Sequence, residues 1–516
     1  MRPKVSLDKS GFGAQPCESV PPEPRHRLRA LDLGPLAAGR LLQGLGALIT
    51  IRMMTQYLLP RQVGALAEIG VMVAMISLVA VTPVWHYCLR ALNTWLDRNI
   101  WNRELTRFLV YIMVVASLGG MLTLLIQWRF GLLLGVSASV MGMLVALNVF
   151  FSPAYVAGST GLNLIHRRTH FALFSNVPVW IGLGSSLLLI FLWNRSAGAW
   201  YLGQDLGYLA GGLSLVFLWR LLRVQHSAQL KTGGRHDGLA LSWRSVFPFA
   251  WPISLRNAIW WCQSQGNRVL VAWLMGPRDL GMFAVAYGLV AAPLMMAENT
   301  MQHLYEPQFY ADLARGSDPL LLGRAWEHFA GVYIPALILV GCYLGASGPL
   351  LAKLVLGPRF QVVGEFAAIP ALSETLRGIN SMFTNLGMAK LDMKVTISPV
   401  VAGAIATLSA TALLAPRWSY VGALWGAAIG TAAVFLVSVV KTASVLPVRW
   451  PWRKMFNALL MALPGVVGLV GFSRVVNRLS MVMVIAGLLV GGIYFLLLVT
   501  ILINKGLRSA AVSAAA

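Results

Sequence analysis

Charged residues are scarce in this chain. Only 11% of its 516 residues are Asp, Glu, Lys or Arg, whereas a soluble domain carries about 25%. Hydrophobic residues make up 57% of the sequence, and the mean hydropathy is +0.70. This composition argues against a water-soluble fold.

Acidic residues are the scarcest of the charged residues. The chain has 18 Asp and Glu against 41 Lys and Arg, a formal net charge of +23. A basic balance can indicate nucleic-acid binding, but the basic residues are not spread evenly. Roughly 27 lie in loops on one side of the predicted spans and roughly 9 on the other, as the positive-inside rule expects. Much of the charge therefore sets membrane orientation.

Motifs for covalent or metal chemistry are also missing. The four cysteines (Cys17, Cys88, Cys262 and Cys342) show no CxxC spacing, so neither a disulfide framework nor a zinc site is predicted. The sequence contains no HExxH, nucleophile elbow or DxD-like site, and every predicted outer loop is about fifteen residues or shorter. We predict no enzyme, metal or cofactor; a membrane-embedded polysaccharide ligase or polymerase stays as an alternative from another class.

Long apolar runs are what the sequence does contain. The run FLVYIMVVASLGGMLTLLIQW at 108–128 is one of several that reach the roughly 20 residues a helix needs to cross the hydrocarbon. The sequence predicts an all-α polytopic membrane protein with about 14 transmembrane helices.

Loop charge and proline or glycine punctuation divide the chain. We expect two six-helix lobes, related as parallel repeats around a central cavity, and two further helices. The predicted segments are a basic cytoplasmic tail (1–32), an N-lobe (33–222), a cytoplasmic linker (223–245), a C-lobe (246–446) and a final part with two helices and a C-terminal tail (447–516).

A repeated phrase supports the two lobes. LLPRQVG at 58–64 and LMGPRDLG at 274–281 both lie between apolar runs, and their prolines are 217 residues apart. Gly135 and Gly357 match at 222, and Pro178 and Pro399 match at 221. Ordered matches at similar offsets indicate a duplication, of the kind found in transporters that bind their substrate between two repeats.

Five arginines fall inside predicted spans, and four follow the repeat. Arg40 and Arg52 are twelve apart, as are Arg256 and Arg268, with 216 residues between equivalents; Arg377 is the fifth. Unpaired at mid-membrane they would cost on the order of 15 kcal/mol. We expect them to face a shared cavity, with bends at Gly44 and Gly46 in one helix and at Gly266 in the other.

Guanidinium groups offer donors that match phosphate oxygens, so the arginines predict a diphosphate site. The alternative is that they pair with acids or reach an interface; Glu374, three residues before Arg377, is placed for such a pair. Glu298 is the candidate for ion coupling, unless it pairs with Arg90. The predicted substrate-binding residues are Arg40, Arg52, Arg256, Arg268, Arg377, Gln43, Gln263, His86, Arg90 and His303.

Beyond the proline-glycine elbows, three segments carry a resemblance: LVLGPRF (354–360), GMAKLDMKVTISPVVAGA (387–404) and PRWSYVGALWGAAIG (416–430). With them the chain resembles the Wzx-like polysaccharide and O-antigen flippases of the multidrug/oligosaccharidyl-lipid/polysaccharide (MOP) exporter superfamily. The resemblance implies flipping of an undecaprenyl-pyrophosphate-linked oligosaccharide across the bacterial inner membrane by alternating access, for exopolysaccharide, O-antigen or capsule export.

The same resemblance implies a coupling ion, H+ or Na+, and no cofactor. It implies a monomer with both termini in the cytoplasm, surrounded by membrane lipids, that can work beside a polysaccharide polymerase or export machinery and binds no nucleic acid. A lipid II-type peptidoglycan precursor flippase is the nearest alternative.

Overall fold

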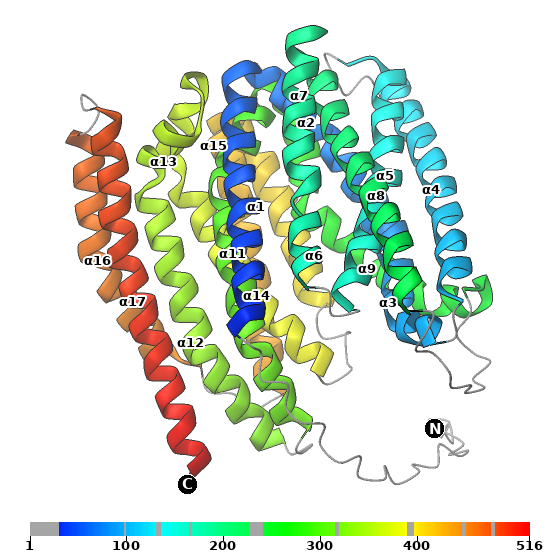
Figure 1. The fold of residues 1–516 in the computed structure, drawn as a ribbon. Coiled ribbons are helices and arrows are strands. Elements are labelled where there is room, and N and C mark those ends of the chain that lie inside the picture. Colours follow the sequence, from blue (N-terminus) through cyan, green and yellow to red (C-terminus); the bar gives the residue numbers. More distant parts are fainter. Residues whose placement is uncertain are drawn as a thin grey trace, which may run out of the picture.

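The protein is described by a computed structural model for residues 30–97, 100–130, 136–164, 168–226, 241–314, 319–389, 397–445, 450–475 and 480–515, and these residues are almost entirely helical (Figure 1). The elements are α1 (Ala30–Tyr57), α2 (Pro60–Ile76), η1 (Ser77–Val81), α3 (Thr82–Asp97), α4 (Trp101–Phe130), α5 (Ala138–Leu164), α6 (Arg168–Phe174), α7 (Val177–Leu192), α8 (Ala197–His226), α9 (Trp243–Ser264), α10 (Gly266–Met275), α11 (Pro277–Ala314), α12 (Pro319–Ala346), α13 (Gly348–Val355), η2 (Pro358–Phe366), α14 (Ala368–Ala389), α15 (Ile397–Val445), α16 (Trp452–Val475) and α17 (Met481–Ala515).

Nine helical segments among the described residues are long and apolar enough to cross a membrane. One of them, Ile397–Lys441, consists of two helices joined at Trp418 and Ser419, whose backbone is not helical. The long helices α1, α8 and α14 and the pair α9–α10 pack among these spans. The chain is therefore a multi-pass helical membrane protein, compatible with the fourteen predicted spans.

The helices pack as two groups with an addition at one side. In the first half (α1–α8), α4 packs on α5, and α8 packs on α5 and α7. In the second half (α9–α15), α15 packs on α9, α10 and α14, and α14 packs on α12. Helices α16 and α17 lie at the edge of the molecule against α12 (Figure 1).

The two repeated phrases lie against each other. Helices α2 and α11 begin with them and cross closely: a Cβ on Gly64 would lie 1.7 Å from the carbonyl oxygen of Pro277, and a Cβ on Gly281 would lie 2.0 Å from that of Pro60. Each glycine thus faces the proline of the other phrase. We call this end of the bundle the elbow end.

Helix α1 also joins the second half. The Thr55 hydroxyl accepts a hydrogen bond of 2.9 Å from the Gly357 amide, and Arg52 donates to the Leu356 carbonyl. Away from the elbow end, α9 packs on α3 and η1, and Asn257 donates to the Leu78 carbonyl at 2.8 Å. The halves are therefore in contact in more than one place along their length.

The expected bends differ between the two equivalent helices. The seventh predicted span is broken at Gln265, between α9 and α10, so the bend at Gly266 is present. Helix α1 instead runs unbroken through Gly44 and Gly46. These glycines allow close packing, because a Cβ would lie 2.8 Å from Met296 at one and 2.6 Å from Val179 at the other.

Three predictions concern residues outside the described ranges: most of the basic tail, most of the linker at 223–245, and the match at Gly135. The two remaining prolines of the repeat, Pro178 and Pro399, both lie in the first turn of a helix, α7 and α15 respectively. Proline is tolerated there because the first amides of a helix have no partner within it.

Candidate functional site

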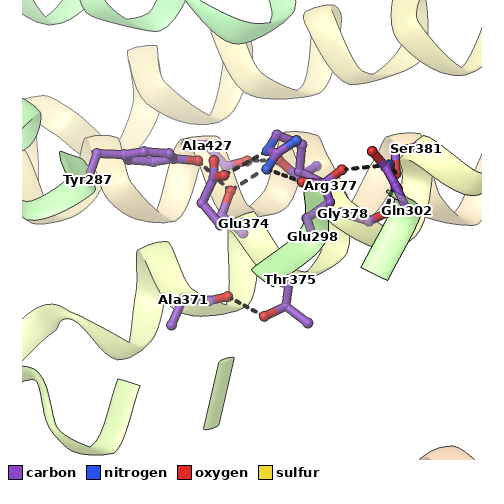
Figure 2. Close-up of polar contacts among 12 residues, drawn as sticks. Tyr287, Glu298, Gln302, Ala371, Glu374, Thr375, Arg377, Gly378, Ser381 and Ala427 are labelled. Atoms are coloured by element: carbon purple, nitrogen blue, oxygen red, sulfur yellow. Dashed lines mark hydrogen bonds and ion pairs between the residues drawn. The ribbon is translucent and has the colours of Figure 1, made fainter. Parts of the chain in front are cut away.

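Arg377 on α14 lies between two acids, as Figure 2 shows. Its Nε is 2.6 Å from Glu374 Oε2 on the same helix, and its Nη2 is 2.7 Å from Glu298 Oε2 on α11. The side chains of both acids are 6% exposed. The local pair that the three-residue spacing indicated is confirmed, and Glu298 pairs with Arg377 rather than with Arg90.

Neutral polar groups extend this cluster. Gln302 on α11 donates to Glu298 Oε1 at 3.3 Å and to the Ser381 hydroxyl at 3.0 Å, and Tyr333 on α12 donates to the Gly378 carbonyl (Figure 2). Two carboxylates thus neutralise the guanidinium of Arg377. The positive charge for an anionic substrate must come from other arginines.

Arg256 on α9 has no such partner. Its Nε is buried without a hydrogen-bond partner, and no acid among the described residues forms an ion pair with it. The group that interacts with it electrostatically is His86 on α3, which is exposed. Two of the predicted site residues, from different halves, are therefore neighbours.

Arg268 on α10 lines a pocket between the halves that holds about 400 Å³ of empty space. It also interacts electrostatically with Tyr287 and Glu374, so it lies beside the Arg377 cluster. Arg52, its counterpart in the repeat, donates to the Leu356 carbonyl just after the last turn of α13. A cation is stabilised at a helix C-terminus, so Arg52 holds α1 to this connection.

The other predicted residues are spread over the interior. Gln43 on α1 and Gln263 on α9 are half-buried, and Gln263 packs close to Gly403 of α15. Arg90 on α3 is exposed. Arg40 and His303 lie in α1 and α11, but their side chains are outside the described part of the structure.

The structure also contains a polar pair that our sequence reasoning missed. Asn148 on α5 donates to Asp205 Oδ1 on α8 at 2.7 Å; Asp205 is 1% exposed, and its second oxygen has no partner. The signal was present, since an acid inside an apolar run is itself informative. Within the described residues, no three His, Cys, Asp or Glu side chains are grouped to hold a metal ion.

Comparison with known proteins gives matches to family and fold. Residues 143–313, about a third of the chain, match a family described as polysaccharide biosynthesis protein. No curated protein sequence matches this chain.

Solved structures match over most of the length. A lipid II flippase, MurJ, in an inward closed conformation superposes with a TM-score of 0.64 at 11% identity, covering 92% of this chain and 99% of that one. A multidrug resistance MATE family transporter of the MOP superfamily, in its inward-facing conformation, superposes with a TM-score of 0.51 at 13% identity, covering 83% and 92%.

These neighbours are a flippase and a transporter, and neither is an enzyme. The chain is a multi-pass membrane protein with the fold of the MOP superfamily, and its residues 143–313 carry the pattern of a polysaccharide biosynthesis family.

Proposed function

We propose that this protein flips an undecaprenyl-pyrophosphate-linked oligosaccharide from the cytoplasmic to the outer leaflet of a bacterial inner membrane. The observation that carries the proposal is Arg256, a guanidinium inside the bundle that has no acidic partner among the described residues. A buried charge without a partner is costly, and an anionic substrate group would offset that cost.

The size of this effect is sufficient. At an effective dielectric constant near 20 and a separation of 5 Å, one arginine and one phosphate charge attract by about 3 kcal/mol. Arg268 supplies a second positive charge on the same broken span, and Arg40 a third on the equivalent span. The sugars would occupy the polar space between the halves, while the prenyl tail stays in lipid.

Movement would occur by alternating access. The contacts between α2 and α11 and between α1 and α13 would open when the substrate leaves at the elbow end, and those between α9 and α3 would open at the other end. In this proposal the elbow end faces outward, both termini are cytoplasmic, and an H+ or Na+ gradient drives the cycle. The protein acts as a monomer and delivers its product to a polysaccharide polymerase.

The test is transport in reconstituted vesicles with a fluorescent undecaprenyl-diphosphate oligosaccharide. Arg256→Ala should slow flipping by on the order of 100-fold, the equivalent of about 3 kcal/mol. The control is Arg278→Ala, which removes the same charge at an exposed position on α11 and should flip normally. Wild-type rates in folded Arg256→Ala protein, alone and combined with Arg40→Ala, would contradict the proposal.

A lipid II-type precursor is the second candidate, favoured by the superposition with MurJ over 99% of that chain. It is also an anionic, lipid-linked sugar, so the same arginines would serve it. Competition separates the two: unlabelled lipid II should leave the flipping of the oligosaccharide unchanged if the first proposal is right, and should suppress it if lipid II is the substrate.

A further inference from the structure

Glu68 on α2 is a buried acid without a partner. The residue is 6% exposed, and neither oxygen of its carboxyl group has a hydrogen-bond partner. The acids of the Arg377 cluster are equally buried but are paired. An ionised carboxylate in such a place loses its hydration without compensation, which costs several kcal/mol.

The surroundings of Glu68 join the two halves. It lines the pocket of about 400 Å³ with Thr123 and Gln127 of α4 and Met141 of α5, all in the first half. The remaining wall comes from α10 of the second half and includes Arg268. A movement of the halves relative to each other would therefore open this pocket to water.

Arg268 is the one charged group that shares the pocket with Glu68, within the described part of the chain, and it interacts with Glu374 and Tyr287 instead. Charged groups on the other helices packed against α2 have neighbours elsewhere. Arg52 donates to Leu356, Asp205 accepts from Asn148, Glu104 pairs with Arg107, Glu298 pairs with Arg377, Asp279 accepts from Ser419, and Arg256 lies near His86.

We propose that Glu68 is a proton-binding site between the two halves. Its carboxyl group is protonated in the arrangement seen here, and it releases the proton when the halves separate and water reaches the pocket. The resulting carboxylate attracts Arg268, which then leaves Glu374. Proton binding at Glu68 thus selects between two positions of one arginine.

The geometry favours a proton over a metal cation. Hard cations bind several oxygen ligands at once, whereas the Glu68 oxygens have no polar neighbour within hydrogen-bond distance. Most of the remaining lining residues are apolar: Val71, Met72, Ile126, Val269 and Ala272. A neutral carboxylic acid is the form that suits such a site.

This inference rests on the proposed function only for its role in driving transport; proton binding is measured without a substrate. The probe is infrared difference spectroscopy of the purified protein in lipid nanodiscs, wild type minus Glu68→Gln, from about pH 5 to about pH 9. We expect the carbonyl band of a protonated carboxylic acid near neutral pH, shifted in D2O and absent from the variant. The matched control, wild type minus Glu374→Gln, should show the bands of an ionised carboxylate.

Two results would overturn the proposal. One is a carboxylate signal from Glu68 at every pH, which would mean that it is ionised when buried. The other is loss of the protonated band when sodium chloride replaces choline chloride at constant pH, which would make the site a sodium site. Flipping that fails while the band appears would count against the transport proposal and leave the proton site standing.

Discussion

Two glycines set the distance between the halves at the elbow end. Gly64 and Gly281 each face a proline carbonyl of the opposite helix, at a separation that leaves no room for a Cβ. The rest of α11 is not so constrained, since a Cβ on Gly288 would have nothing within 4 Å. The repeated phrase therefore conserves contact as well as a turn.

Replacing Gly281 by alanine should destabilise the protein. The new methyl group would overlap the Pro60 carbonyl, and overpacking of this kind costs about 1–3 kcal/mol. Gly281→Ala should therefore lower the Tm of the purified protein, whereas Gly288→Ala in the same helix should leave it unchanged or raise it slightly. Equal melting temperatures for the two variants would mean that α2 and α11 do not cross this closely.

Arginines at equivalent positions of the repeat have different environments. Arg52 donates to the end of a short helix, whereas Arg268 lines a pocket and lies near Glu374. The spacing predicted that both would lie inside the bundle. It could not predict the partners, because these come from α13 and α14, segments more than a hundred residues away in the chain.

At the scale of elements, Arg377 fastens α14 to α11. One carboxylate partner is on its own helix and the other is 79 residues earlier in the chain. Removing one member of such a group leaves buried charge uncompensated, which costs more than the group contributes as a whole. The cluster is therefore sensitive to single changes and tolerant of a balanced one.

Arg377→Met should accordingly destabilise the protein by about 3–5 kcal/mol, because Glu298 and Glu374 lose their counter-charge. Adding Glu298→Gln and Glu374→Gln should restore most of that loss. The measurement is the Tm of the single and triple variants in one detergent. A triple variant that melts below Arg377→Met would show that the acids are not held by this arginine.

At the scale of the whole molecule, α16 and α17 form an addition to the two halves. They pack on α12 through apolar residues such as Ala462, Leu469 and Leu488, and Tyr343 donates to the Leu488 carbonyl at 3.0 Å. Lipid tails are as apolar as these side chains, so the addition contributes little that lipid cannot replace.

A chain that ends at Pro451 should therefore still fold. We expect it to insert, to elute as a single species in size-exclusion chromatography, and to melt at a lower temperature than the full chain. Tyr343→Phe in the full chain measures how much of that decrease comes from the lost hydrogen bond. Aggregation of the shortened chain would assign α16 and α17 an essential part in folding.

The sequence by itself determined the membrane class, the helices, the duplicated phrase, the break at Gly266 and the pair of Glu374 with Arg377. These depend on apolar length, on glycine and proline, or on residues one helical turn apart, and all are local. Tertiary structure alone decided that the two phrases meet, that Glu298 pairs with Arg377, and that Glu68 has no partner while facing the other half. Those outcomes depend on which distant helices pack together, and a single sequence carries no signal for the distance between two such side chains.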